Sequence, residues 1–200
     1  RVWVENSPTM NISMAEATHH LKKDKGIVIV GSGLFTSAHT PLDPDNGTAT
    51  PWQSYVFGAQ IAEVEVDLDT GEVQVLGVWA AHDVGRVVNP QQVEGQIEGG
   101  IVMGVGHALM EEYTQDRGQV TSPGFAKYIL PTTLDIPNIH STLITEPDPK
   151  TPLGVKGIGE PCITPTAPAI INAIYDAVGV RITSLPATPE KVLAGILKLK

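Results

Sequence analysis

The chain has 200 residues, a formal net charge of −9, 42% hydrophobic residues and 18% charged residues. This length is enough for one domain with a buried core or for pieces of two, and the composition excludes a disordered chain. The acidic balance argues against nucleic-acid binding, because no basic stripe is present to meet phosphates. No apolar run reaches the roughly 18 residues that cross a bilayer. A single cysteine is compatible with a reducing compartment, so we expect a cytoplasmic protein with no membrane partner.

The N-terminal residues predict a short helix over 11–23. Asn11 or Ser13 can cap this helix, and Glu16, three residues after Ser13, completes a capping box. The chain begins at Arg1 in mid-pattern rather than at an initiator methionine, which is typical of a fragment or a processed subunit.

Residues 26–31, GIVIVG, predict a short buried strand. They run into GSG at 31–33, which is only a weak sign of a nucleotide-binding module because a third glycine and a following helix are missing. Residues 36–54 predict a polar, proline-rich loop that could reach a partner or a substrate channel.

A hairpin is predicted over residues 59–81. The first strand, 59–68, alternates between apolar and acidic residues, and Asp69-Thr70-Gly71 supplies the turn. Its apolar face is formed by Ala62, Val64, Val66 and Leu68, with Ile61 outside the register. The return strand, 72–81, is more apolar, so we expect it to lie further inside the sheet.

A tight loop over 81–90 leads to Pro90, which suits the first position of a helix. Residues 90–113 have helical periodicity. The predicted buried stripe consists of Val93, Ile97, Ile101, Val105 and Leu109.

This predicted helix carries five glycines, which together lower its helical preference by about 4–5 kcal/mol relative to alanine. The five are Gly95, Gly99, Gly100, Gly104 and Gly106. Two causes are open: a close helix crossing, or a ligand that lies on the helix backbone. Gln96, beside Gly95, has an amide that can donate to a ligand oxygen. His107 is interpreted as a buried or rim histidine rather than a metal ligand.

The last third of the chain predicts a short strand and two helices. The strand is expected within residues 125–137, between proline-marked turns. One helix follows Thr164 or Thr166 and stops at Gly179, and the other opens at Thr188-Pro189-Glu190.

The segment GVKGIGEPC, residues 154–162, places Glu160 after three glycines and before Pro161. The glycines allow the backbone to approach a ligand closely, and the proline disfavours helical angles at Glu160. If its apolar neighbours bury it, this carboxylate would hold a proton more readily than usual and would suit general-base work. Two plainer readings stay open: Glu160 caps the next helix, or it pairs with Lys156.

Three segments, residues 83–112, 125–137 and 154–182, together resemble the C-terminal part of the molybdenum-binding subunit of the xanthine dehydrogenase/aldehyde oxidase family. Their order and spacing carry the resemblance, which extends from about residue 26 to the end. It implies an α+β fold in which a mixed sheet has flanking helices. Residues 1–200 would form the C-terminal segment of a molybdopterin-binding domain that another chain or a missing N-terminal region completes.

The resemblance also implies a molybdenum hydroxylase that oxidises an aldehyde or a purine-like heteroaromatic compound, with water as the oxygen source. Glu160 would take a proton from the metal-bound hydroxyl, whose oxygen then attacks an electron-poor carbon. Gln96 would bind the molybdopterin cofactor, present as its cytosine dinucleotide form, and Lys156 and Gly159 would lie near it. No side chain of this chain is expected to bind the metal.

The implied partners are the upstream molybdopterin-binding region, an iron–sulfur subunit and an FAD subunit, because no iron–sulfur cysteine pattern or flavin motif occurs here. A different hypothesis is a scaffold that binds a partner without any cofactor. The presence of both Glu160 and Gln96 argues against it. Cys162 is interpreted as a buried small side chain rather than a redox group.

Overall fold

The computed structural model describes residues 1–36, 40–50 and 52–199, with the side chains of Trp3, Val4 and Pro8 excepted. The chain divides into two compact units, Arg1–Thr36 and Ser37–Lys200. No helix among the described residues is long and apolar enough to cross a membrane.

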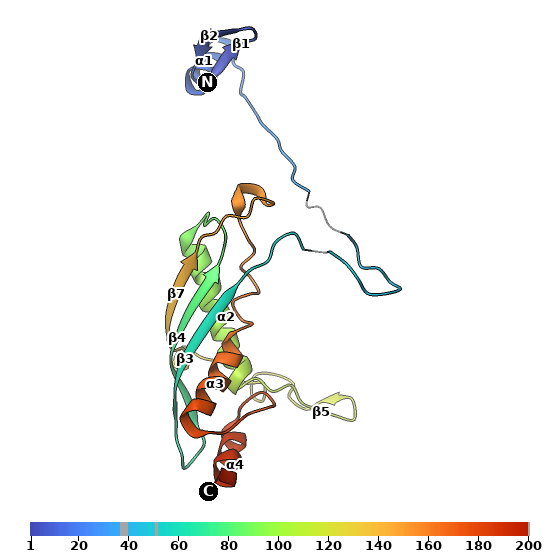
Figure 1. Ribbon diagram of the computed structural model, residues 1–200, viewed down its shortest axis with the longest axis vertical. Coiled ribbons are helices and arrows are strands. Elements are labelled where there is room, and N and C mark those ends of the chain that lie inside the picture. The colour runs from blue at the N-terminus through green and yellow to red at the C-terminus, as the bar shows by residue number, and fades with distance from the viewer. Residues whose placement is uncertain (37–39, 51, 200) are drawn as a thin grey trace. The chain divides into compact units, whose positions relative to one another are not determined.

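The N-terminal unit is a small hairpin followed by a helix (Figure 1). Strands β1 (Val2–Val4) and β2 (Ser7–Ile12) pair antiparallel, and the sequence reading missed both. Helix α1 (Met14–Lys25) begins as predicted: Ser13 accepts from the Glu16 backbone N–H, and the Glu16 carboxylate accepts from the Ser13 N–H. The capping box is therefore confirmed.

The strand predicted over residues 26–31 is wrong. The segment leaves α1 through Gly26 in the left-handed conformation and forms no strand within the described chain. Its side chains are exposed rather than buried, with Val28 at 70% and Val30 at 84% exposure. The physical reason is that a strand needs a neighbouring backbone to satisfy its N–H and C=O groups, and no described strand pairs with this segment.

The larger unit is built on a three-stranded mixed sheet in the order β3-β4-β7 (Figure 1). Strands β3 (Gly58–Val66) and β4 (Val73–Asp83) form the predicted antiparallel hairpin, and β7 (Asn138–Ile144) pairs parallel with β4. The more apolar β4 is the central strand, as expected. Leu68 departs from the prediction: it is 56% exposed, because the chain is already turning there.

The strand predicted within residues 125–137 is also misplaced, because that stretch consists of turns and β7 begins directly after it. The Thr132 backbone N–H and hydroxyl both donate to the Asp135 carboxylate, which fixes a turn where a strand was expected. A two-residue pair, β5 (Gln115–Asp116) and β6 (Gln119–Val120), precedes it.

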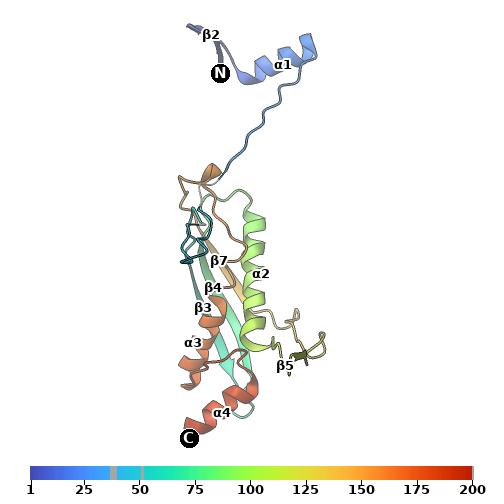
Figure 2. The same ribbon diagram turned by 90° about the vertical axis from the view of Figure 1, so that its right-hand side faces the viewer.

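Helices α2 (Pro90–Leu109) and α3 (Thr166–Val178) lie on one side of this sheet (Figure 2). Asn89 caps α2 and Pro90 occupies its first turn, whereas its end comes four residues before the predicted 113. Helix α3 stops at Gly179 as predicted, although Pro165 precedes it without any side-chain cap. The 3₁₀ turn η1 (Pro152–Gly154) and helix α4 (Pro189–Leu199) complete the unit.

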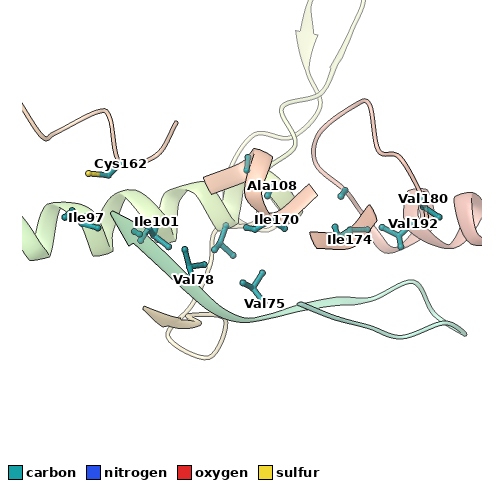
Figure 3. Packing of buried hydrophobic residues seen from close by; sticks show 14 of the residues in the cluster. Val75, Val78, Ile97, Ile101, Ala108, Cys162, Ile170, Ile174, Val180 and Val192 are labelled. Atoms are coloured by element: carbon teal, nitrogen blue, oxygen red, sulfur yellow. The ribbon is translucent and has the colours of Figure 1, made fainter. Parts of the chain in front are cut away.

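The core lies between the sheet and the two helices, where Ile97 and Ile101 of α2 are fully buried (Figure 3). Val78 reaches them from β4, and Ile170 and Ile174 from α3. Cys162 belongs to the same cluster and is fully buried, as the sequence predicted. The observed mixed sheet with flanking helices matches the predicted α+β class.

Candidate functional site

The loop between β4 and α2 is bonded, backbone to backbone, to the segment that leads to Glu160. The N–H of Arg86 donates to the Gly154 carbonyl over 2.8 Å, and the N–H of Lys156 donates to the Val84 carbonyl over 3.2 Å. Between them, Gly85 has φ +62° and its Cα faces the Gly154 carbonyl so closely that a side chain would collide with it. Two motifs that lie about 70 residues apart in the sequence thus form one structural unit.

A buried ion pair stabilises the contact between these two motifs. The ammonium group of Lys156 donates to Asp83 Oδ2, and the side chains are only 9% and 10% exposed. Burial alone would raise the pKa of Asp83, but the bond and charge of Lys156 and the N–H of Gly85 outweigh it and hold the pKa below its ordinary value. The Lys156 ammonium group is therefore bound to Asp83, and only the rest of the residue faces the neighbouring pocket.

Glu160 lies in the turn between this contact and α3. Its side chain is exposed and forms no hydrogen bond or ion pair with any described residue. The two alternative roles considered from the sequence are both wrong. Glu160 does not cap α3, which has no side-chain cap, and it does not pair with Lys156, which pairs with Asp83. The buried surroundings considered from the sequence are not provided by the described part of this chain, so the carboxylate is presented outward.

The residues predicted to meet the cofactor gather at one pocket. A cavity of about 260 Å³ is lined by Gln96 and Lys156 together with Arg86, Asn89 and Gln92. A Cβ atom at Gly159 would lie 3.8 Å from Gln96 Oε1, so the turn that carries Glu160 passes beside the same amide. The structure therefore brings Gln96, Lys156 and Gly159 together, and Glu160 follows Gly159 in the chain without lining the pocket.

A larger cavity of about 540 Å³ lies elsewhere and contains none of these residues. Its lining includes four carboxylates, those of Glu65, Asp67, Glu72 and Asp135. Such a lining disfavours a phosphate-bearing ligand by charge repulsion, whereas the smaller pocket offers amides and one guanidinium. The smaller pocket is therefore the better candidate for a cofactor.

The five glycines of α2 divide into two groups. A Cβ atom at Gly100 would lie 2.6 Å from the Cys162 Cβ, one at Gly104 would overlap Thr166, and one at Gly106 would meet Pro131 at 2.8 Å. At Gly95 and Gly99 a Cβ atom would have no described neighbour within 4 Å. Close packing thus explains three of the glycines, and the remaining two leave bare backbone on the face that carries Gln96.

Sequence reasoning passed over Asp83 and Arg86 as site residues, although both stand in the quoted motif 83–112. The available signal was a carboxylate just after the end of an apolar predicted strand, two residues before a glycine. His107 is exposed. Nowhere in residues 1–36, 40–50 and 52–199 do three or more His, Cys, Asp or Glu side chains come close enough to hold a metal ion.

Comparison with known proteins gives a consistent family. The family model described as a molybdopterin cofactor-binding domain matches residues 1–137. The xanthine dehydrogenase molybdenum-binding subunit of Escherichia coli O157:H7 is 36% identical over 163 residues, which is 78% of this chain and 22% of that protein. The aldehyde oxidoreductase of Megalodesulfovibrio gigas is 39% identical over 177 residues, which is 86% of this chain and 19% of that protein.

A solved structure agrees with the sequence relatives. The aldehyde oxidoreductase from Desulfovibrio gigas superimposes with a TM-score of 0.72 at 37% identity, over 80% of this chain and 17% of that one. The chain spans about a fifth of the length of the curated relatives it matches, 22% and 19% in the two cases. It therefore belongs to the xanthine dehydrogenase/aldehyde oxidase family of molybdopterin-binding proteins.

Proposed function

We propose that this chain supplies the catalytic base and part of the cofactor site of a molybdenum hydroxylase. The observation that carries the proposal is the meeting of Gln96, Lys156 and the Glu160 turn at one pocket. In the proposed enzyme the oxygen of water is added to an aldehyde or a purine-like heteroaromatic ring. The names of the relatives, a xanthine dehydrogenase subunit and an aldehyde oxidoreductase, support these two substrate classes.

The residues around the pocket fit a molybdopterin cofactor. The bare backbone at Gly95 and Gly99 leaves room for a flat ring system beside the exposed amide of Gln96. Arg86 and Gln92 line the same pocket near the first turn of α2, where a helix favours anionic groups such as phosphates. Gln96 would hold the pterin through its amide, and the stem of Lys156 would form part of the wall. The cytosine dinucleotide form is our expectation for the phosphate-bearing end.

Glu160 is the base in this proposal. The bound cofactor supplies the metal that accepts two electrons from the substrate. The chain contributes a carboxylate that no described residue neutralises, and it removes the proton from the water-derived hydroxyl group that becomes the new oxygen of the product. Pro161 and the neighbouring glycines hold this carboxylate on a short turn that faces outward.

The remainder of the site must come from elsewhere, because the chain spans only about a fifth of its relatives. We propose that an upstream molybdopterin-binding region closes the pocket and buries Glu160. Iron–sulfur and FAD subunits would carry electrons away. The cytoplasmic location and the assignment of residues 1–200 as the C-terminal segment of a two-part domain stay predictions.

The test is Glu160→Gln in the assembled enzyme, with the exposed Glu63→Gln on β3 as the matched control. We expect hydroxylation to fall by about 10³-fold or more while the molybdenum and pterin contents stay at the wild-type level. The control should keep full activity. Near-normal turnover in Glu160→Gln would reject the base assignment, and a purified complex without molybdenum would favour the scaffold hypothesis.

A further inference from the structure

A polar network of buried and half-buried side chains bonds to the turn that contains Glu160. The Gln60 amide nitrogen, on β3, donates to the Cys162 carbonyl over 2.8 Å. The Thr166 hydroxyl, at the start of α3, donates to Gln60 Oε1 over 2.7 Å. The same amide nitrogen lies 3.1 Å from Nε2 of His82, which is fully buried on β4. Gln60 therefore joins two strands, the turn and a helix through one side chain.

The Cys162 carbonyl fixes which way the Gln60 amide faces. A carbonyl can only accept, so the NH₂ group of Gln60 must face it, and Oε1 must face the Thr166 hydroxyl. The second amide proton then points at His82 Nε2, which must accept. His82 is accordingly neutral with its proton on Nδ1, an atom that is buried and has no described partner. The Thr166 hydroxyl also lies 3.1 Å from the Cys162 carbonyl, so its one proton has two acceptors, whereas the Gln60 amide has one orientation.

The network holds Cys162 while Glu160 extends from it. The Cys162 thiol donates to the Ile158 carbonyl over 3.2 Å, and its Cβ packs against the bare backbone of Gly100. The Ile163 N–H donates to the Glu160 carbonyl over 3.3 Å. The turn is therefore held by hydrogen bonds from the Cys162 thiol and from the Ile163 N–H. The bond from Gln60 links the turn directly to β3.

We propose that Gln60 is a positioning residue that sets the place of the Glu160 carboxylate through the Cys162 carbonyl, with His82 and Thr166 fixing the amide. This inference rests on the proposed role of Glu160 as base. A base displaced by even about 1 Å loses much of its effect, up to about 100-fold in rate. Gln60 is not among the residues that line the pocket, so we expect it to act on turnover rather than on binding.

The experiment uses the assembled holoenzyme with Gln60→Met, which keeps the side-chain length and removes the amide. We expect kcat to fall about 10- to 100-fold with KM and molybdenum content unchanged. Deuterium exchange of a peptide covering residues 158–163 should speed up, while exchange in the first turns of α2 stays at the wild-type rate. This exchange measurement reports on the turn independently of activity.

A double-variant comparison separates positioning from general damage. If Gln60 acts through Glu160, Gln60→Met should change the residual rate of Glu160→Gln by less than about twofold. An equal loss in both backgrounds would overturn the proposal. Glu160→Gln with normal turnover rejects the base itself, whereas an inactive Glu160→Gln beside an unaffected Gln60→Met rejects only the positioning role.

A second pair of variants keeps the proposal testable if Gln60→Met does not assemble. Thr166→Val removes the hydroxyl that bonds Gln60 Oε1 and also lies 3.1 Å from the Cys162 carbonyl, and Thr166→Ser retains it. We expect a loss of kcat in Thr166→Val and recovery of at least half of the wild-type kcat in Thr166→Ser. Equal kcat values in these two variants would contradict the network.

Discussion

The inner side of the Glu160 site, which faces the protein core, and the outer side, which is exposed, differ in how their polar groups are paired. On the inner side polar groups are paired within the chain, with His82 Nδ1 as an exception: Asp83 pairs with Lys156, and Gln60 donates to the Cys162 carbonyl. On the outer side Glu160 is exposed without a described partner, and Gly99 faces open space. Substitutions on the inner side should therefore lower stability, and those on the outer side should lower function without any loss of stability.

Breaking the buried ion pair should have the largest effect. Asp83→Asn leaves the Lys156 ammonium buried without a counter-charge, which lowers the free energy of unfolding by about 3–5 kcal/mol. Chemical denaturation measures this change. The double variant Asp83→Leu with Lys156→Met should lose less than the two single losses added together, because it leaves no lone charge. A loss below about 1 kcal/mol in Asp83→Asn would show that the pair is solvated.

The Asp83–Lys156 ion pair also predicts that the free energy of unfolding decreases at low pH. Because the pKa of Asp83 is lowered in the folded state, its contribution to stability is present above its unfolded pKa, near 4. That contribution is lost as the pH falls through the folded pKa. The slope of unfolding free energy against pH below about pH 4 should therefore be smaller in Asp83→Asn than in the wild type.

The next largest effect on stability is expected at the glycines of α2 that pack closely against other residues. A methyl group at Gly104 would overlap Thr166, so Gly104→Ala should lower the free energy of unfolding by about 1–3 kcal/mol. The gain in helix propensity, about 1 kcal/mol, offsets only part of the overlap. A Gly104→Ala variant as stable as the wild type would mean that α3 shifts freely away from α2.

The buried histidine gives a smaller, pH-dependent effect. Burial lowers the pKa of His82, and its cross-strand neighbours Gly58 and Leu143 and its hydrogen-bond partner Gln60 carry no charge. Its contribution is complete above pH 6.5 and declines as the pH falls from there through its folded pKa, by up to about 1.4 kcal/mol per pH unit. Thermal unfolding between pH 7 and pH 5 measures the decline, which His82→Gln should remove.

The open glycines should show the smallest change in stability, and in the opposite direction. Gly99→Ala and Gly95→Ala should each stabilise the chain by about 0.5–1 kcal/mol, because a methyl group there meets no described atom. In the assembled enzyme the same variants should lower the molybdopterin content. If stability rises and cofactor content stays normal, the bare face serves some contact other than the cofactor.

Local patterns in the sequence predicted those parts of the fold that local interactions determine. The Ser13–Glu16 capping box and the start of α2 at Pro90 depend on residues within one turn of each other, and the β3–β4 hairpin pairs two strands that follow each other directly in the chain. The strand expected over 26–31 failed because pairing depends on a neighbour that sequence alone does not supply. The Gln60–Cys162 contact spans 102 positions, so no periodicity could reveal it.

The candidate site was predictable to a different extent. The motifs around Gln96 and Glu160 identified the family, and the structure adds that their backbones pair through Val84 and Lys156. The partner of Lys156 could not be predicted, because the nearest acid in the sequence is Glu160 whereas the acid in contact is Asp83, 73 residues away. Sequence distance favoured the wrong carboxylate.

The buried Cys162 has a practical consequence for experiments on this chain. It is the only cysteine in the sequence, and burial raises the pKa of its thiol to about 11. At pH 8 about one thiol in a thousand would be ionised, so the native chain should resist maleimide reagents. A cysteine introduced on an exposed position such as Glu63 would then carry a fluorophore or spin label alone, without any prior substitution of the native residue.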